Sequence, residues 1–363
     1  MSEWKKYRLG DVAQLVKDTW KVGDEELPYI GLEHIVEGRL RLQGVGDSNT
    51  IASNKFRFNP DCFLFGKLRP YFRKLYRPDF EGICSTDIWV IKPKGENDKD
   101  FLFYFFANQE FVDFSYSGSS GTRMPRADWD FVSQSKWKFP EPNEQKAIAS
   151  VLSSLDDKID LLHRQNKTLE QMAETLFRQW FIEEAKEDWE ETTLGGIIKI
   201  GSGKGLKKDK FIDNGEYPIL GANGEIGRTN GYLFDDRLIY TGRVGTLGNV
   251  FRIENKKVWL SDNTLIIKPI IYYNYVYFIL KNAKLGQYNV GSTQPLIRQS
   301  DIKEIEIALL DEKIHIEFEK KSDLLFDKMN KNKQQIRTLE KLRDTLLPKL
   351  MSGEVRVKIW DKV

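Results

Sequence analysis

The sequence is poor in the residues that most often build reactive sites. Its 363 residues include only two cysteines, Cys62 and Cys84, and three histidines, His34, His163 and His315. These residues are scattered, so they lack the clustered spacing of a zinc site. Two cysteines, and no secretory signal in the opening MSEWKK, indicate free thiols in a reducing cytoplasm. We therefore expect a cytoplasmic protein without a metal centre.

Long apolar runs and a strong net charge are also missing. The most apolar stretch, LIIKPIIYYNYVYFIL at 265–280, contains Lys268 and Pro269 and is shorter than the roughly 20 residues that cross a bilayer. Acidic and basic residues nearly balance, with a formal net charge of +2. The sequence thus predicts no membrane segment, and any nucleic-acid surface must come from local basic clusters.

Motifs for phosphate or cofactor binding are incomplete. In GSGKG at 201–205, Ile198 and Gly205 stand where a Walker A motif needs Gly and Ser or Thr. The run NPDCF at 59–63 differs from the N-P-P-F/Y tetrad of adenine methyltransferases at its third and fourth residues. We therefore predict a non-catalytic chain without a cofactor of its own.

Two long stretches carry the heptad pattern of paired helices. Apolar residues recur at the a and d positions from Leu152 to Trp180 and again from Ser322 to Leu350, with one asparagine in each seam. The residues expected to pair the helices are Leu155, Ile159, Leu162, Asn166, Leu169, Leu325, Met329, Asn332, Ile336 and Leu339.

The two asparagines predict that these helices run antiparallel. In an antiparallel pair an a residue faces a d residue, so one register places Asn166 opposite Asn332. A parallel pair would bury each amide against an aliphatic side chain, where it finds no hydrogen-bond partner. The alternative is two separate amphipathic helices docked on globular domains, which Ser322 and Arg343 in the seam favour.

The chain also contains a tandem repeat. The segment 155–176 matches 325–346 at an offset of 170, and CSTDIWVIKP at 84–93 matches LSDNTLIIKP at 260–269 at an offset of 176. A period this long predicts a duplicated unit of one globular domain and one helix, not a solenoid. Short β-branched and aromatic runs between Gly, Asn and Asp residues make the globular parts rich in strands.

The predicted fold class is therefore α+β, with two tandem globular domains joined by two long antiparallel coiled-coil helices in a pseudo-two-fold arrangement. We expect the first helix to begin after Pro142 with Asn143 as its N-cap, and the second to begin at Asp311. The expected boundaries are 1–142 for the first domain, 143–186 for the central helix, 187–310 for the second domain and 311–363 for the distal helix.

Basic and aromatic residues gather in loops of both globular domains. Cations beside planar rings suit a nucleic-acid groove, although a solvated strand edge with its rings in the core gives the same pattern. Arginine can bind guanine through two hydrogen bonds, and glutamine binds adenine in the same way. The candidate DNA-binding residues are Lys67, Arg69, Tyr71, Arg73, Lys74, Arg123 and Arg126 in the first domain, and Lys204, Lys207, Lys208, Arg243, Thr293, Gln294 and Arg298 at places we take as comparable in the second.

Three segments resemble a known family. The run from 139 to 181, beginning FPEPNEQKAIASVL, and TLLPKLMSGEVRV at 345–357 resemble the central and distal conserved regions of the specificity subunit (HsdS) of type I restriction-modification systems. GKLRPYFRK at 66–74 is similar to a stretch common in that family's recognition domains. The resemblance extends over essentially the whole chain.

The resemblance implies a function as well as a fold. It implies two target-recognition domains that each read half of a split site in double-stranded DNA. It also implies that the helices bind two copies of a methylation subunit (HsdM), that a restriction subunit (HsdR) can join, and that S-adenosylmethionine is bound by the partner, which methylates adenine. The alternatives are a self-contained DNA methyltransferase or nuclease, and a duplicated interaction protein that does not bind DNA.

Overall fold

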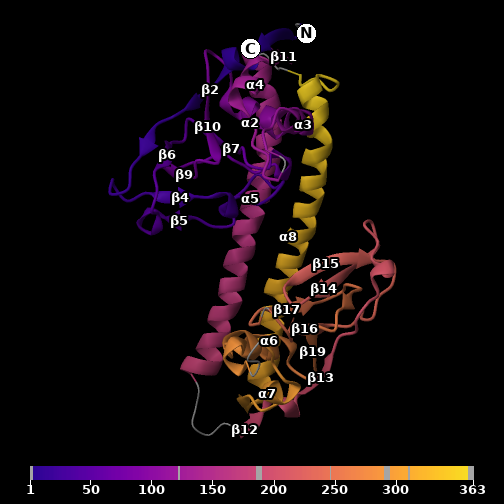
Figure 1. Cartoon of the computed structure of the whole chain (residues 1–363). Helices are drawn as coiled ribbons and strands as arrows, with labels where there is room; N and C mark the ends of the chain where they lie inside the picture. Colours follow the sequence, from indigo (N-terminus) through magenta and orange to yellow (C-terminus); the bar gives the residue numbers. More distant parts are fainter. Residues whose placement is uncertain are drawn as a thin grey trace, which may run out of the picture. The chain divides into compact units, whose positions relative to one another are not determined.

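Two long helices divide their lengths between two units of the chain. The computed structural model describes residues 3–121, 123–184, 190–245, 247–289, 295–309 and 311–358. The first unit contains Met1–Arg164 and Lys333–Val363, and the second contains Gln165–Asn332. Helices α5 (Pro142–Arg178) and α8 (Glu312–Ser352) each contribute one segment to each unit (Figure 1). Both units mix helices and strands, which confirms the α+β class.

The first unit is built on an antiparallel four-stranded sheet. One central strand is buried along its whole length and the other over its first four residues, as expected for a sheet covered on both faces. The strands lie in the order β2 (Ala13–Val16), β10 (Ile88–Pro93), β7 (Phe63–Gly66) and β8 (Leu75–Tyr76). A five-stranded sheet has the order β3 (Thr19–Trp20), β6 (Lys55–Phe58), β9 (Gly82–Cys84), β4 (Pro28–Ile30) and β5 (Gly46–Asp47), and β1 (Lys5–Arg8) pairs with β11 (Lys136–Phe139).

Helices rich in aromatic residues cover one face of the four-stranded sheet. The sequence places a single helix over 101–111, but the structure has two, because the extended backbone of Asn108 separates them. Phe63 and Phe65 of the sheet pack against Phe106 with ring centroids 5.1 and 5.9 Å apart. The helices of this part are α1 (Leu9–Val12), α2 (Lys99–Ala107), α3 (Gln109–Ser117) and α4 (Trp129–Gln134).

The second unit repeats this topology. Its four-stranded sheet has the order β13 (Ile198–Ser202), β19 (Thr264–Pro269), β16 (Leu238–Gly242) and β17 (Val250–Ile253), which correspond to β2, β10, β7 and β8. The three-stranded sheet β15 (Gly224–Thr229), β14 (Tyr217–Gly221) and β18 (Trp259–Leu260) keeps the parallel pair found between β4 and β9. β12 (Glu190–Thr193) pairs with β20 (Glu306–Leu309), and the helices are α6 (Tyr273–Asn282) and α7 (Gln299–Lys303).

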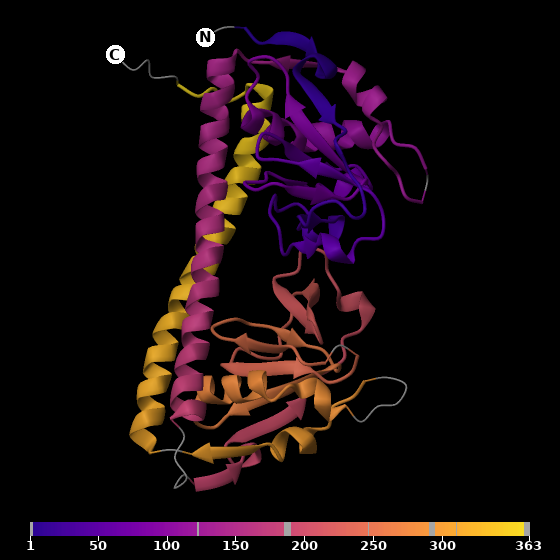
Figure 2. The ribbon, with the colours of Figure 1, turned by 90° about the vertical axis from the view of Figure 1, so that its left-hand side faces the viewer.

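Within each unit, the segments of α5 and α8 run antiparallel (Figure 2). In the second unit, Asn332 Nδ2 donates to Asn166 Oδ1 at 3.0 Å, which confirms the predicted register. In the first unit, Ile159 and Leu162 form a cluster with Ile336 and Leu339. The remaining helix-pairing candidates, Leu155, Leu169, Leu325 and Met329, are buried or half-buried.

The arginine in the seam is stabilised by a carboxylate. Arg343 is 1% exposed, and its Nη1 lies 2.8 Å from Asp156 Oδ1. Asp156 also accepts a 2.7 Å hydrogen bond from the hydroxyl of Tyr104. This pairing explains how a heptad a position accommodates a cation. A second polar residue of the seam, Ser322, is fully buried.

The helix ends correct one prediction. Helix α5 begins at Pro142 and not after it, because proline lacks the N–H that the first turn leaves unpaired. The carbonyl of Glu141 accepts from the amides of Glu144 and Gln145, so Asn143 is not the N-cap. For α8, Asp311 lies just before the first residue and its side chain accepts from the amide of Lys313 at 2.8 Å.

Removing one seam amide should destabilise the second unit. We expect Asn332→Leu to lower the free energy of unfolding by about 2 kcal/mol, because the amide of Asn166 stays buried without this partner. The double variant N166L/N332L should be more stable than the sum of the two single effects predicts, because neither helix then buries an amide. Urea unfolding of the four proteins measures this coupling. Purely additive losses would contradict it.

The second unit should also lose stability in acid. His315 is fully buried and stacks on Tyr272 with ring centroids 4.1 Å apart, and burial lowers its pKa to about 4. This folded-state pKa lies below the unfolded value near 6.5. The neutral imidazole of His315 therefore contributes its full stability to the fold above pH 6.5, and this stability is lost as the pH falls towards 4. The loss amounts to about 3 kcal/mol. In urea unfolding, the free energy of unfolding should differ less between pH 7.5 and pH 4.5 for His315→Phe than for the natural chain.

Candidate nucleic-acid interface

Two loops of the first domain are joined through their main chains. The amide of Lys67 donates to the carbonyl of Asp87 at 2.9 Å, and that of Arg69 donates to Pro125 at 2.7 Å. The amide of Ala127 donates back to the carbonyl of Lys67 at 2.9 Å. We call residues 67–69 and 125–127, with residue 87, the paired-loop frame of this domain. It brings the basic cluster after β7 next to the loop that carries Arg123 and Arg126.

The second domain contains the same frame. Arg243 N donates to Asn263 O at 2.8 Å, Gly245 N to Pro295 O at 3.0 Å, and Ile297 N to Arg243 O at 3.0 Å. Each bond matches one in the first domain, at offsets of 176 for residues 243, 245 and 263 and 170 for residues 295 and 297. An isolated β-bridge completes both copies, Leu68 to Arg126 and Val244 to Leu296. The paired-loop frame is therefore a feature of the repeated unit.

One position of the frame needs an unusual backbone. Arg69 has φ +51° and its counterpart Gly245 has φ +85°, so both occupy the left-handed region. Glycine adopts this region without the steric cost that a Cβ imposes. Arg69 adopts it beside Phe72, whose ring centroid lies 5.9 Å from the guanidinium carbon.

The rim of the first frame carries exposed rings and cations. Tyr71 is 43% exposed and lies edge-on to Tyr116 of α3, with ring centroids 5.5 Å apart. Arg123 is exposed, and Lys67 is half-buried. Arg126 Nε donates to Asp87 Oδ1 at 2.9 Å, and Arg126 Nη2 to Asp87 Oδ2 at 3.4 Å. Most of these residues lie on, or directly after, the two loops that the frame joins, and we call the group the rim surface of this domain.

Two candidates of the basic cluster have partners inside their own unit. Arg73 Nη2 donates to the carbonyl of Gly38 at 3.0 Å, and Lys74 Nζ donates to that of Leu32 at 2.7 Å. Burial lowers the pKa of Arg73 despite Asp344 nearby. These contacts support a structural role for both side chains.

Most of the candidate residues of the second domain that the structure describes do not lie at the positions that match those of the first domain, contrary to the prediction from sequence. Lys204, Lys207 and Lys208 are exposed but follow β13, the counterpart of β2, whereas the first basic cluster follows β7. Arg298 precedes α7 as Asp128 precedes α4, so it does not take the place of Arg123 or Arg126. Of the second-domain candidates that the structure describes, only Arg243 occupies a frame position, that of Lys67. Thr293 and Gln294 lie outside the described residues.

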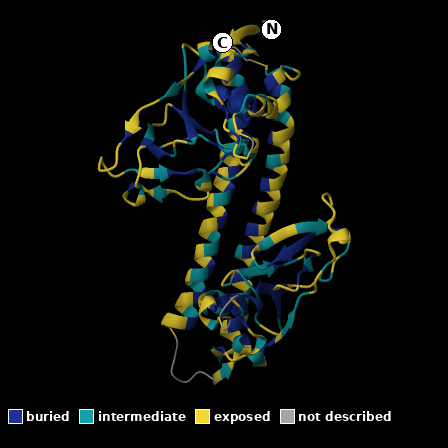
Figure 3. Ribbon diagram, viewed as in Figure 1, coloured by how far each residue is buried: buried dark blue, intermediate teal, exposed yellow. Residues whose placement is uncertain are grey.

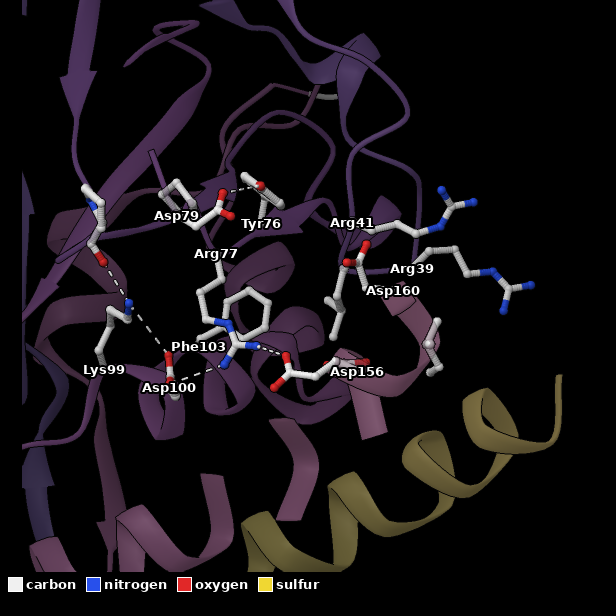
Figure 4. A pocket seen from close by; sticks show the side chains of 15 residues that line it. Arg39, Arg41, Tyr76, Arg77, Asp79, Lys99, Asp100, Phe103, Asp156 and Asp160 are labelled. Carbon is white, nitrogen blue, oxygen red and sulfur yellow. Dashed lines mark hydrogen bonds and ion pairs between the residues drawn. The ribbon is translucent and has the colours of Figure 1, made fainter. Parts of the chain in front are cut away.

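A pocket of about 470 Å³ in the first unit does not belong to this surface (Figure 4). Its charges compensate one another: Arg77 lies 3.3 Å from Asp100 and 3.4 Å from Asp157. A site with balanced charges does not attract a polyanion. The charged lining residues are Arg39, Arg41, Arg77, Lys99, Asp79, Asp100, Asp156, Asp157 and Asp160.

The described parts of the chain contain neither a metal-type cluster nor a membrane-spanning helix. Among these residues, no group of three or more His, Cys, Asp or Glu side chains is arranged to hold a metal ion. None of the described helices is both long and apolar enough to cross a membrane. Cys62 and Cys84 are free and buried, and burial raises the pKa of both thiols.

The sequence could have indicated the frame but not its side-chain contacts. Asp87 and Asn263 share a place in the 84–93 and 260–269 repeat, and both closing loops contain a proline, Pro125 and Pro295. The ion pair of Arg126 with Asp87 joins residues 39 positions apart. No spacing rule connects them.

Comparison with known proteins covers nearly the whole chain. A family model described as the type I restriction modification DNA specificity domain matches residues 1–171 and 186–337. The MjaIX specificity subunit of a type I restriction enzyme from Methanocaldococcus jannaschii is 27% identical over 312 residues, 74% of this chain and 72% of that protein. The MjaVIII specificity subunit from the same organism is 26% identical and covers 98% and 94%.

The fold has a solved counterpart. The crystal structure of the S subunit of a type I restriction-modification system from M. genitalium superposes with a TM-score of 0.61. The superposition covers 96% of each chain at 18% sequence identity. The likeness concerns the fold.

Proposed function

Because this chain belongs to the type I restriction modification DNA specificity family, we propose that it is the subunit that selects the DNA sequence in a type I restriction-modification complex. It is a non-catalytic subunit and recognises DNA for its partners. Its target is a split site in double-stranded DNA. The first recognition domain, 1–142, reads one half-site, and the second, 187–310, reads the other.

The repeated frame is the observation that carries this proposal. Two domains with the same main-chain hydrogen bonds carry different residues at matching positions, Lys67 and Arg69 in one and Arg243 and Gly245 in the other. A shared frame gives both domains the same approach to DNA, and different side chains give each its own sequence preference. Cations at the rim supply phosphate contacts.

The paired helices set the distance between half-sites in this proposal. As an antiparallel coiled coil in a pseudo-two-fold arrangement, roughly 30 paired residues per helix extend ~45 Å at 1.5 Å per residue. That length exceeds one turn of B-DNA, ~34–36 Å, so the helices act as a ruler for the non-specific spacer. The amide pair of Asn166 and Asn332 supports the fixed register that a ruler needs.

The outer faces of the helices supply surfaces for partner subunits. Figure 3 shows exposed residues along α5 and α8. Met172 is 49% exposed and Leu342 is 44% exposed, and they are equivalent in the repeat at the offset of 170. Two equivalent apolar positions support the binding of two copies of the methylation subunit (HsdM), and a restriction subunit (HsdR) joins this complex. The complex acts in the cytoplasm.

The chemistry takes place on the partner. The methylation subunit binds S-adenosylmethionine, and its target adenine leaves the base stack before it is methylated. This chain contributes the choice of site and needs no cofactor of its own.

Mapping N6-methyladenine across a genome tests the proposal. Cells that make this chain with a cognate methylation subunit should gain a split motif with one methylated adenine in each half and a fixed spacer. Cells without this chain should lack that motif. Assembly of the complex without any new motif would contradict the proposal, and methylation or cleavage by the isolated chain would favour the self-contained enzyme instead.

A further inference from the structure

We propose that Arg126 reads a guanine in the half-site of the first recognition domain and that Asp87 positions it for this contact. The inference rests on the proposed function, because it assigns one base of the target to one side chain. It starts from the ion pair at the rim of the first paired-loop frame.

The main chain holds Arg126 in place from two sides. Its amide donates to the carbonyl of Ser120 at 3.1 Å, and its carbonyl accepts from the amide of Ser120 at 3.2 Å. The β-bridge to Leu68 ties the same residue to the loop after β7. The Cα of Arg126 is therefore fixed although its side chain is 45% exposed.

The carboxylate of Asp87 fixes the guanidinium. It accepts from Nε at 2.9 Å and from Nη2 at 3.4 Å, so it occupies the side edge of the planar group. A guanidinium has five N–H donors in a rigid fork. Among the described residues, the hydrogen bonds of the Arg126 side chain go to Asp87 alone. Nη1 and the second N–H of Nη2 are left at the other edge for a ligand.

That remaining edge fits guanine better than phosphate. Guanine presents O6 and N7 in the major groove, two acceptors that arginine binds through two parallel hydrogen bonds. A phosphate would gain little from Arg126, because the charge of Asp87, itself 28% exposed, already offsets that of the guanidinium. Because the pair of Arg126 and Asp87 is rigid and locally neutral, its remaining N–H groups select the orientation of a ligand and add little long-range electrostatic attraction.

The second domain lacks this pair at the same place. Leu296 occupies the frame position of Arg126, and Asn263 that of Asp87. An aliphatic side chain cannot donate to guanine. At this frame position, a guanine contact is therefore possible in the first domain and not in the second.

Methylation of DNA libraries by the full chain with its methylation subunit and S-adenosylmethionine tests the inference. Each position of one half-site is randomised in turn, and the other half-site is kept. For Arg126→Gln we expect the preference for guanine to fall by about 5- to 150-fold at one position of one half-site. Asp87→Asn should weaken the preference at that same position by less. The unchanged preference in the other half-site reports that each variant is folded.

Arg123→Gln is the matched control, because Arg123 lies in the same exposed loop but outside the frame. Because Arg123 is a rim cation that contacts phosphate, its loss should weaken methylation of all sequences alike and leave the relative preference for each base intact. The inference fails if Arg126→Gln keeps all preferences, weakens all sequences equally as loss of a phosphate contact would, or if Arg123→Gln alters the same guanine position. A natural chain that yields no split motif would instead overturn the proposed function itself.

Discussion

Replacing Arg343 with methionine should lower the free energy of unfolding of the first unit by about 3 kcal/mol. The main cause is that the carboxylate of Asp156 stays buried without its cation, and not that the attraction to Arg343 is lost. The side chain of Asp156 is 16% exposed, and among the described residues the hydroxyl of Tyr104 is the donor that would remain to it. Urea unfolding at neutral pH measures the change.

Two further variants show whether the buried charge is responsible. Arg337→Met removes an exposed arginine from the same helix and should change stability by less than about 0.5 kcal/mol. The double variant R343M/D156N should recover part of the loss, because asparagine carries no charge that needs a cation. Equal effects of Arg343→Met and Arg337→Met would contradict the role of the ion pair.

Shortening both helices by one heptad should shorten the spacer in the DNA target by about three base pairs. Seven residues at 1.5 Å each remove ~10 Å of helix, and DNA rises ~3.4 Å per base pair. Deleting 163–169 from α5 and 329–335 from α8 removes two facing layers of the seam and keeps the heptad phase on both sides. The methylated motif should keep both half-sites and change only in its spacer.

A deletion confined to one helix is the control. Removing 163–169 alone shifts every later seam residue against its partner, so we expect an unstable protein and no methylated motif. An unchanged spacer after the matched double deletion would refute the ruler. A change in the half-sites themselves would show that the helices do more than separate the two domains.

The helix seam could be predicted from sequence because a single period governs it. Residues 3.5 positions apart on average fall on one face, so the heptad pattern identified Ile159, Leu162, Met329 and Ile336 as buried. The asparagine in each stretch then gave the register, since an amide needs a polar partner. In the globular parts, the sequence repeat predicted that the two copies contain equivalent strands at matching positions.

The side-chain contacts of the candidate interface could not be predicted in this way. Arg73 and Lys74 look like DNA contacts in sequence, but their partners are carbonyls of Gly38 and Leu32, more than 30 residues away. Such contacts depend on how loops fold over one another, which no local period encodes. For the same reason the match of Lys204 with the first basic cluster was wrong: two charge runs of similar composition follow strands that are not equivalent.

The frame that joins the loops uses main-chain atoms for all three of its hydrogen bonds. Any amino acid except proline can supply an amide, and every amino acid supplies a carbonyl. With the contact proposed for Arg126, substitutions at residues 126 and 296 alter recognition while the main-chain hydrogen bonds of the frame remain. Selection can act on recognition with little penalty in folding, and a duplicated gene segment can acquire a different preference in each copy by point mutation. Few point mutations are therefore needed to change the DNA sequence that such a protein recognises.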